Sequence, residues 1–415
     1  MFKRVVLGIS GGVDSAVAAL MLKRKGFDVQ GVFMRNWDIA DETGTCRADE
    51  DFKDANYVCN QLNIKLHHVN FVKEYWNEVF SNLVKDYETG LTPNPDILCN
   101  RHVKFKYFYN YAMDQLNADA IATGHYAKTS FGPYLDQFKT NESVRLLMAE
   151  DPVKDQTFFL CQIEQEALRR TMFPLGGLAK WEVKQLAVEN SLEKFAIKRE
   201  SMGICFIGSR NFQDFIKEYI PDKPGQFVDL DTAEIVGEHT GIHKWTLGQR
   251  SRLESLPEPF FICGKNVENN IIYVVQGTNH PSLYSTLCST SDAHWIHSEP
   301  QELQNNKILN CDFKFQHTQN RVKCKLCKLS TGLVVKLETP LRALTPGQYA
   351  VFYNGQECLG SARIVNVGPS NFILNYPLEV RSNNTENCIE KSHKFVRNRR
   401  KVGNKIASSS EKKKK

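Results

Sequence analysis

The sequence has no long apolar run. Over 415 residues, no stretch approaches the roughly 18–20 apolar residues that a membrane-spanning helix needs. The chain enters a strand-like run within its first residues, which leaves no room for the charged and apolar regions of a signal peptide. We therefore expect a soluble protein that is not secreted and has no membrane partner.

The 12 cysteines lack a regular spacing. Disulfide frameworks are typical of short secreted chains, so irregular cysteines in a long chain indicate reduced thiols, some of them reactive. The stretch CKLC, residues 324–327, has the spacing of a zinc-ligand pair, but no second pair lies at a suitable distance. Because Cys324 also fits the alternation of a strand, we expect no metal site there.

Positive charge is concentrated near the C-terminal end. The net charge is +6, yet residues 391–415 alone contain eleven Lys and Arg against one Glu, so residues 1–390 are mildly acidic. A basic segment with so few apolar residues is expected to be disordered. It either attracts a polyanion through counterion release or serves only as a solubilising tail, and the composition leaves both open.

The first 130 residues alternate between strand-like and helix-like segments. The strand-like runs are 4–10, 27–34, 64–71 and 118–124, and helical patterns lie near 15–25, 49–62, 73–86 and 101–116. This alternation predicts an α/β fold with a parallel sheet covered by helices on both faces. Ligands of such sheets bind beyond the carboxyl ends of the strands.

The pattern changes after about residue 215, where turn signals separate β-like segments and helical periodicity fades. The clearest β-like segments are 271–275, 333–338 and 349–353. We expect a catalytic α/β domain at 1–215, a small β-rich domain at 216–283, an antiparallel barrel or sandwich at 284–381, and a basic tail at 382–415.

The stretch VVLGISGGVDSAVAAL, residues 5–20, lacks the lysine that follows the glycines of a Walker loop and holds the β- and γ-phosphates. Gly11 and Gly12 let the backbone N–H groups, with nearby serine hydroxyls, surround anionic oxygens at a helix N-terminus. Asp14 would repel phosphates unless it binds Mg²⁺ that bridges them. Such a loop favours attack at the α-phosphate with departure of pyrophosphate, which forms an adenylate.

The segment SGGVDS resembles the PP-loop of the ATP-pyrophosphatase superfamily. That superfamily includes amidating synthetases, argininosuccinate synthases and tRNA-modifying enzymes, so the loop predicts adenylation without fixing the acceptor. Other stretches of the chain are needed to decide which of these classes the protein belongs to.

Two cysteine-containing stretches bear on that choice. TPNPDILCNRHVKF, residues 92–105, places Cys99 near a helix start, where the helix dipole and nearby cations favour a lowered thiol pKa. Three such side chains follow it: Arg101, His102 and Lys104. ESMGICFIG, residues 200–208, places Cys205 between two glycines in a run too short for a core helix. Taken alone, each cysteine is also compatible with a small buried residue.

Nine motifs occur in the order seen in tRNA-specific 2-thiouridylases, and the resemblance covers residues 3 to about 367. They are GISGGVDS, GVFMRNWD, TPNPDILCN, ATGHYA, KDQTFFL, FPLGGL, SMGICFIG, TLGQR and TPGQYAVFY. KEYWN and ESMGICFIGSRNF resemble the animal mitochondrial branch of this family, although residues 1–9 contain no Arg-rich presequence. The resemblance implies a PP-loop domain, a small central domain, a C-terminal β-barrel and a mitochondrial location.

The resemblance also implies the site residues. ATP, with Mg²⁺ on Asp14, is the implied cofactor. Its implied binding residues are Gly8, Ile9, Ser10, Gly11, Gly12, Val13, Asp14 and Ser15, with Met34 and Gly124 near the adenosine. The residues implied to contact tRNA are Asn94, Pro95 and Asp96 at the target base, and Lys154, Asp155 and Gln156 elsewhere. Cys99 matches the nucleophile of the family and Cys205 matches the persulfide carrier.

The implied reaction is 2-thiolation of the wobble uridine in tRNAs for Lys, Glu and Gln. Adenylation converts the uridine C2 oxygen into a leaving group, because it becomes part of a phosphate ester. A persulfide on Cys205 then delivers sulfur, while Cys99 attacks the inner sulfur and closes a disulfide. The implied partners are tRNA, a protein that brings sulfur from a cysteine desulfurase, and a thiol reductant, and we expect a monomer.

Three alternatives remain beside this interpretation. A PP-loop synthetase or amidotransferase would adenylate a small molecule, but it needs an ammonia source or an amino-acid pocket, which the β-rich remainder does not suggest. A catalytically silent tRNA-binding protein would not need both the loop and the two cysteines. An iron–sulfur cluster on three cysteines would replace the persulfide route.

Residues 251–261 depart from the glycine-bearing segment of bacterial relatives, so we expect a different loop conformation there.

Overall fold

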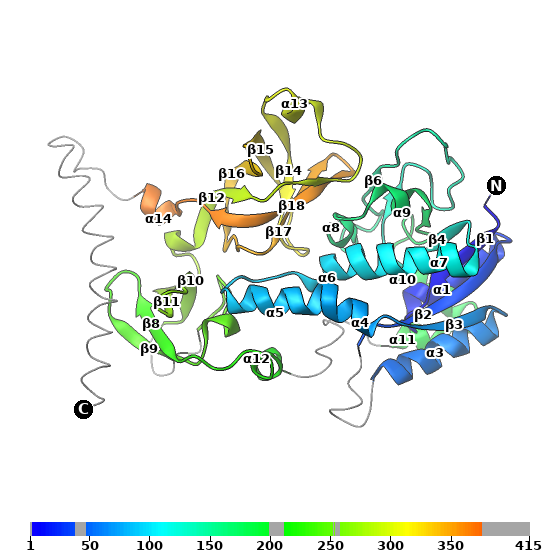
Figure 1. Cartoon of the computed structure of the whole chain (residues 1–415), viewed down its shortest axis with the longest axis horizontal. Helices are drawn as coiled ribbons and strands as arrows, with labels where there is room; N and C mark the ends of the chain where they lie inside the picture. The colour runs from blue at the N-terminus through cyan, green and yellow to red at the C-terminus, as the bar shows by residue number, and fades with distance from the viewer. Residues whose placement is uncertain (1, 38–46, 199–210, 252, 254–257, 376–415) are drawn as a thin grey trace. The chain divides into compact units, whose positions relative to one another are not determined.

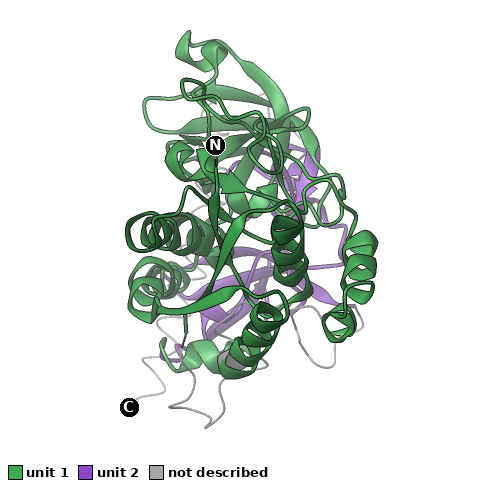
Figure 2. Ribbon diagram, turned by 90° about the vertical axis from the view of Figure 1, so that its right-hand side faces the viewer, with its two compact units in different colours: residues 1–220, 288–339, 346–366 green, residues 221–287, 340–345, 367–415 purple. Residues whose placement is uncertain are grey.

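The computed structural model describes residues 2–37, 47–198, 211–251, 253 and 258–375 (Figure 1). The chain forms two compact units (Figure 2), of which unit 1 comprises residues 1–220, 288–339 and 346–366, and unit 2 comprises the rest. In the part of the chain that the structure describes, no helix is long and apolar enough to cross a bilayer.

A five-stranded parallel sheet is the centre of the first 220 residues, with the strand order β3-β2-β1-β4-β7. Its strands are β1 (Arg4–Gly8), β2 (Asp28–Arg35), β3 (Lys65–Asn70), β4 (Ala120–Ala122) and β7 (Thr171–Met172). The middle of β1 is fully buried, because helices cover both faces of the sheet. The four strands predicted from the sequence are confirmed, and the two-residue β7 was not predicted.

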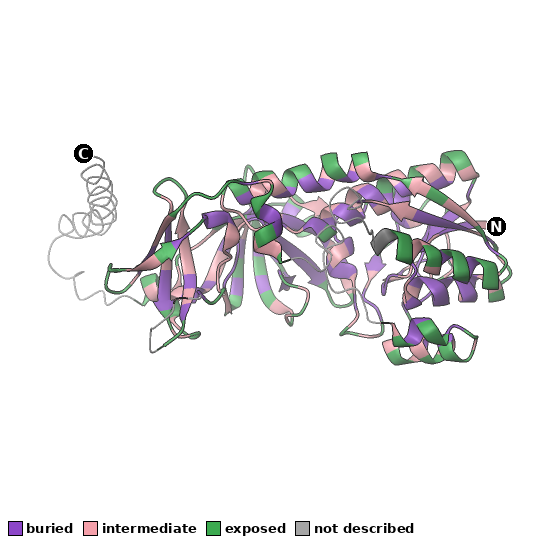
Figure 3. Ribbon diagram, turned by 90° about the horizontal axis from the view of Figure 1, so that it is seen from below, coloured by how far each residue is buried: buried purple, intermediate pink, exposed green. Residues whose placement is uncertain are grey.

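The predicted helices are also confirmed. They are α1 (Val13–Arg24), α3 (Arg47–Gln61), the run α4, η1 and α5 (Val72–Tyr75, Trp76–Phe80, Ser81–Glu88), and the run α6, η2 and α7 (Pro95–Leu98, Cys99–Tyr107, Phe108–Leu116). Burial is concentrated on the helix faces that meet the sheet (Figure 3).

The last of these helical runs begins earlier than the expected residue 101. Asn94 caps it, with its side-chain oxygen accepting from the Ile97 N–H at 3.3 Å, and Pro95 follows at the first helical position. The run ends at Asn117, whose φ of 49° is left-handed.

Short elements connect the sheet to the β-rich part of unit 1. They are β5 (Lys128–Thr129), β6 (Leu146–Leu147), α8 (Thr157–Leu160), α9 (Gln165–Arg169), α10 (Lys180–Val188), α11 (Glu193–Ile197) and α12 (Phe212–Lys217). Among them, α10 and α11 contact α1, so the loop that begins α1 lies close to residues far along the chain.

A second sheet closes into an antiparallel barrel of six strands, in the order β12-β16-β15-β14-β17-β18 with β12 also paired to β18. The strands are β12 (Tyr284–Thr290), β14 (Leu309–Lys314), β15 (Val322–Lys328), β16 (Leu333–Arg342), β17 (Tyr349–Asn354) and β18 (Glu357–Val367). The short elements β13 (His294–Trp295), α13 (Gln301–Gln304) and α14 (Asn371–Leu374) accompany them. Of the expected barrel or sandwich, the structure therefore has the barrel.

Unit 2 contains a four-stranded sheet in the order β10-β11-β8-β9. The strands are β8 (Gly225–Asp229), β9 (Ile235–His239), β10 (Phe260–Asn266) and β11 (Ile271–Gln276), with the single turns η3 (Ile242–Lys244) and η4 (Pro281–Leu283). Ile262, Ile272 and Val274 are fully buried and form its core.

Candidate functional site

The glycine-paired loop joins the carboxyl end of β1 to α1. Gly11 has a φ of +72°, and a Cβ there would lie 2.4 Å from the backbone oxygen of Asp51, so only glycine fits. Gly12 is the N-cap of α1 and has no side chain with which to cap it. The first N–H groups of α1 therefore have no side-chain acceptor from the cap, which is the arrangement expected of an anion site.

Both serine hydroxyls face the interior of this loop. The Ser15 hydroxyl donates to the Gly12 carbonyl at 3.1 Å and accepts from the Ser10 N–H at 3.2 Å, and the two hydroxyls are 3.3 Å apart. Ile9 and Val13, also predicted to line the nucleotide site, are buried in the core. Only their backbone groups are therefore placed to meet a ligand.

The structure brings the other predicted nucleotide residues to the same loop. A Cβ on Gly8 would lie 3.2 Å from the Met34 Cε atom. A Cβ on Gly124 would lie 2.8 Å from the Ser15 backbone nitrogen and 2.9 Å from the Asp14 carbonyl carbon. Gly8 and Gly124 thus permit close approach from β2 and from the end of β4, and the predicted set is contiguous in space.

Asp14 is held by two residues that the sequence analysis missed. Lys180 Nζ lies 2.7 and 2.8 Å from the two carboxylate oxygens, and the buried Tyr126 hydroxyl donates to one of them at 2.8 Å. Lys180 is 166 positions away in sequence, so nothing in the loop indicates it. The available signals were the motifs FPLGGL, which ends two residues before Lys180, and ATGHYA, which contains Tyr126.

The surroundings of Asp14 fit a site that stabilises a cation. Its carboxylate oxygens are acceptors that Mg²⁺ favours, and in this structure they accept from the Lys180 ammonium. No cluster of three or more His, Cys, Asp or Glu side chains suited to a metal ion occurs among the residues described.

A second lysine cluster anchors the outer side of the loop. Lys198 Nζ donates to Asp51 at 2.8 Å, to Asp54 at 2.7 Å and to the Gly11 carbonyl at 3.3 Å. Burial alone would raise the pKa of Asp54, but hydrogen bonds from Lys198 and Lys194 hold this pKa below its usual value. The N-terminal part of α3 is thereby fixed against the loop.

The segment 92–96 is tied to a turn of the barrel. The Gln348 side chain donates to the carbonyl oxygens of Thr92 and Pro93 at 2.9 and 3.0 Å. The Thr92 N–H donates to the Pro346 carbonyl at 3.1 Å. Gly347 has a φ of +96°, and a Cβ there would lie 2.8 Å from the Thr92 oxygen, so this turn requires glycine.

Of the three residues expected at the target base, Asp96 alone has an exposed side chain. Asn94 uses its side-chain oxygen to cap α6, and Pro95 is buried. Partial desolvation raises the pKa of Asp96, and the nearby Lys104 opposes this effect. The Asp96 carboxyl group is therefore the part of this segment that is placed to meet a polar substrate.

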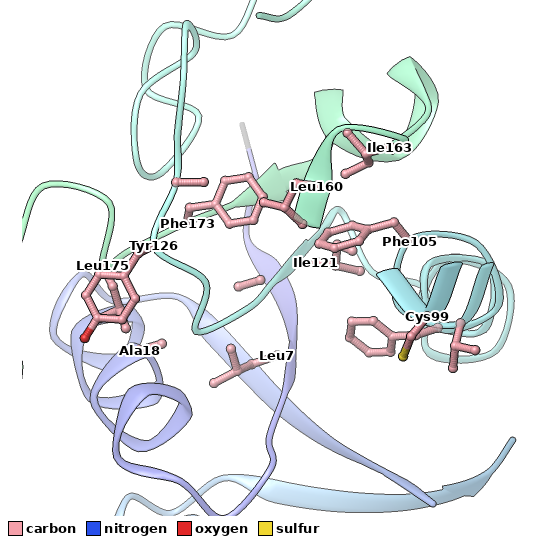
Figure 4. Close-up of a cluster of buried hydrophobic side chains, with 14 of the residues drawn as sticks. Leu7, Ala18, Cys99, Phe105, Ile121, Tyr126, Leu160, Ile163, Phe173 and Leu175 are labelled. Atoms are coloured by element: carbon pink, nitrogen blue, oxygen red, sulfur yellow. The ribbon is translucent and has the colours of Figure 1, made fainter. Parts of the chain in front are cut away.

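Cys99 is the first residue of η2 and is 5% exposed (Figure 4). Two of the three cations expected to act on its thiol have other partners: Arg101 donates to Gln162 at 2.6 Å, and His102 lies 3.7 Å from the Glu78 carboxylate. Desolvation lowers the pKa of His102, so this ring supplies little positive charge at neutral pH. The lowered thiol pKa of Cys99 stays a prediction. Cys205 lies outside the described residues.

Asp155 and Gln156 point into the protein. Asp155 is 1% exposed, and its oxygens accept from the Ala149 N–H at 2.9 Å and the Thr157 hydroxyl at 2.7 Å. Gln156 accepts from the Tyr126 N–H at 2.9 Å, and Tyr126 in turn holds Asp14. Both residues thus position the loop environment, and the neighbouring Lys154 is, like Gln156, half-buried.

Three family models match successive parts of the chain. The tRNA methyl transferase HUP domain matches residues 3–209, the tRNA methyl transferase PRC-barrel domain matches 213–276, and the aminomethyltransferase beta-barrel domain matches 285–364. These ranges follow the order of the parallel sheet, the sheet of unit 2 and the closed barrel.

Curated relatives match along almost the whole chain. The mitochondrial tRNA-specific 2-thiouridylase 1 of Drosophila melanogaster is 53% identical over 89% of this chain and 95% of its own length. The protein of that name in Homo sapiens is 48% identical over 90% of this chain and 92% of its own length. The tRNA-specific 2-thiouridylase MnmA of Bacillus pumilus is 45% identical over 90% of this chain and 98% of its own length. The chain therefore belongs to the tRNA-specific 2-thiouridylase family.

Proposed function

We propose that this protein, a tRNA sulfurtransferase by its family, uses ATP to adenylate the C2 oxygen of the wobble uridine and then replaces that oxygen with sulfur. The observation that carries the proposal is the loop at the end of β1. It combines glycines at positions where close backbone approach leaves no room for a side chain with two inward-facing hydroxyls and a carboxylate. It has no Walker lysine. This combination favours gripping pyrophosphate as a leaving group over transferring the γ-phosphoryl group.

ATP is assigned to the contiguous set of residues around this loop. The backbone from Gly8 to Ser15 would hold the phosphates, and Met34 and Gly124 would lie near the adenosine. Asp14 would hold Mg²⁺, which supplies charge neutralisation of the phosphate oxygens when it is bound. Supporting this assignment, the Asp14 carboxylate already accepts from a cationic side chain.

The target uridine is assigned to the segment Asn94–Asp96, and Lys154 is assigned to another part of the tRNA. Asp96 is the exposed group there, and Cys99 follows it by one turn of the same helical run. In the proposed sulfur transfer, the terminal sulfur of a Cys205 persulfide attacks C2 and AMP leaves with its oxygen. Cys99 then attacks the inner sulfur, so the thiolated base departs and a Cys99–Cys205 disulfide forms.

The proposed substrates are the tRNAs for Lys, Glu and Gln. The disulfide formed in each turnover requires a thiol reductant, and the persulfide requires a donor protein that brings sulfur from a cysteine desulfurase. We place the protein in mitochondria, because the fly and human relatives are named mitochondrial. We also propose that it acts as a monomer. Residues 1–215 would carry the chemistry, and residues 216–283 and 284–381 would help to hold the tRNA.

Tight coupling of adenylation to tRNA distinguishes this proposal from a small-molecule synthetase. Purified protein should release pyrophosphate from ATP when an unmodified cognate tRNA is added, and not with ATP alone. In the same assay, Asp14→Ala should lose this release while its tRNA affinity stays within a few-fold of the wild type. Release that is independent of tRNA, or that persists in Asp14→Ala, would contradict the proposal.

A further inference from the structure

Lys180 and Asp14 form a close ion pair beside the loop. Both carboxylate oxygens lie within 2.8 Å of Lys180 Nζ, and the Lys180 side chain is 12% exposed against 33% for Asp14. The ammonium also lies 5.6 Å from the ring centroid of Tyr126, whose hydroxyl binds the same carboxylate. The cation is thus enclosed by protein on one side and open toward the loop on the other, where Asp14 retains solvent contact.

The backbone that carries Lys180 is fixed by two acidic residues. The Lys180 N–H donates to Asp151 Oδ2 at 3.0 Å, and the N–H of the preceding Ala179 donates to Glu182 Oε2 at 2.7 Å. These contacts satisfy the exposed N–H groups at the start of α10. The backbone from which the Lys180 side chain extends is therefore fixed, which helps to hold its ammonium beside Asp14.

Stability alone does not account for a lysine at this position. Lys180 is the first residue of α10, where the positive end of the helix dipole disfavours a cation. A half-buried ion pair also gains little net stability, because desolvation of the two charges offsets their attraction. The ion pair is better explained by a negatively charged ligand that binds to Lys180.

We propose that Lys180 is a phosphate-binding residue: its ammonium neutralises Asp14 in the nucleotide-free protein and binds the β- and γ-phosphates of ATP and the departing pyrophosphate. In a Walker loop, the lysine that binds these phosphates belongs to the loop itself. Here the corresponding lysine comes from α10. A lysine suits this exchange, since its ammonium has three rotatable donors on a flexible stem. The inference rests on the proposed use of ATP.

The inference predicts a selective loss of affinity for polyphosphate. Lys180→Met removes the charge and keeps most of the side-chain volume, so affinity for ATP and for inorganic pyrophosphate should fall roughly tenfold to a hundredfold, as for a lost charge-assisted hydrogen bond. Affinity for AMP should stay within about threefold, because AMP lacks these phosphates. Lys184→Met, one turn further along α10, is the matched control and should bind all three ligands like the wild type. Calorimetric titration of the full chain without tRNA measures these affinities.

Removal of Lys180 alone leaves the half-buried Asp14 carboxylate without its cation, which threatens folding. The same comparison is therefore also made between Asp14→Asn and the double variant Asp14→Asn/Lys180→Met, in which no such charge remains. ATP should again bind more weakly in the variant without Lys180, with thermal unfolding within a few degrees of Asp14→Asn. Unchanged ATP affinity on removal of Lys180, or an equal loss for ATP and AMP, would overturn the inference. If the wild type binds neither nucleotide, the proposed function fails instead.

Discussion

Gln348 donates from its side-chain amide to the carbonyl oxygen of Thr92 at 2.9 Å, although the two residues are 256 positions apart in sequence. The same amide donates to the Pro93 carbonyl at 3.0 Å, and its oxygen lies 3.4 Å from the Asn94 amide nitrogen. Gln348 precedes β17 of the barrel, and Thr92 precedes α6, which leads to Cys99. The barrel thus fixes the backbone of the segment assigned to the target base.

The first prediction tests this support. Gln348→Ala should lower the rate of tRNA thiolation, because three hydrogen bonds that hold residues 92–94 are lost, each worth about 1 kcal/mol. ATP affinity should be unchanged, since none of these contacts touches the loop. Gln356→Ala, an exposed glutamine after β17, is the control. An equal fall in ATP affinity would show that Gln348 acts on the whole domain and not on the base segment.

The second prediction separates the two cysteines. With radiolabelled sulfur from a cysteine desulfurase system, Cys99→Ser should still be loaded but should yield no thiolated tRNA. Cys205→Ser should not be loaded, because it lacks the sulfur that carries the persulfide. The exposed Cys327 provides a control, and Cys327→Ser should behave as the wild type in both assays. The reverse labelling pattern would mean that the two roles are exchanged.

The third prediction concerns the close approach at Gly124. Gly124→Ala should weaken ATP binding at least several-fold, since its Cβ would lie 2.8 Å from the Ser15 backbone nitrogen and would displace the start of α1. Gly177→Ala is the matched control, because a Cβ there would have no atom within 4 Å. ATP affinity and the melting temperature are measured for both. If Gly124→Ala binds ATP normally, the loop does not need this approach.

The fourth prediction is a pH dependence of stability in unit 2. Burial lowers the pKa of His239 to about 4, with a smaller contribution from His243 and an opposing one from a backbone hydrogen bond of Asn270. Because the folded pKa lies below the unfolded one, the associated stability is present above about pH 6.5 and is lost as the pH falls toward 4. This contribution is on the order of 3 kcal/mol.

Urea unfolding measured between pH 7 and pH 4 tests this sign. His239→Gln should show a flatter decline of the free energy of unfolding than the wild type. His297→Gln, at an exposed histidine, should follow the wild-type decline. Parallel curves for His239→Gln and the wild type would show that His239 is not held neutral by burial.

The sequence predicted the parallel sheet well because its central strands β1 and β4 are apolar runs and because strand-like and helix-like segments alternate along the chain. It missed β7, since two residues carry no periodicity and the strand is defined by pairing to β4. The barrel could not be separated from a sandwich, because closure depends on the pairing of β12 with β18, which no local pattern encodes.

The candidate site also contains some residues that local sequence patterns indicate and others that they do not. The glycines, serines and Asp14 of the loop are local in sequence and were all predicted. Lys180 and Gln348 act through contacts over more than a hundred positions, so periodicity and spacing could not indicate them. For Asp155, tRNA contact stays a prediction that rests on the resemblance, and in the structure its carboxylate oxygens accept from the Ala149 N–H and the Thr157 hydroxyl.

The last prediction concerns residues 391–415, where eleven cations accompany one acidic residue. Each phosphate that such a segment neutralises contributes about 0.7–0.9 to the salt slope of the logarithm of the affinity. Truncation after residue 390 should therefore weaken tRNA binding and flatten its salt dependence. The preference for cognate over non-cognate tRNA should not change, because phosphate contacts carry no base information.

This prediction is checked by measuring tRNA affinity from low to moderate salt, with one cognate and one non-cognate tRNA, for the full-length and truncated proteins. A third protein, in which the cations of the segment are replaced by glutamine, controls for length. It should behave like the truncated protein, since charge and not chain length drives the effect. Turnover at saturating tRNA should survive in all three, because no group assigned to the chemistry lies in the segment. Identical salt slopes would leave the segment as a solubilising tail, and a selective loss of cognate binding would mean that it reads the tRNA sequence or shape.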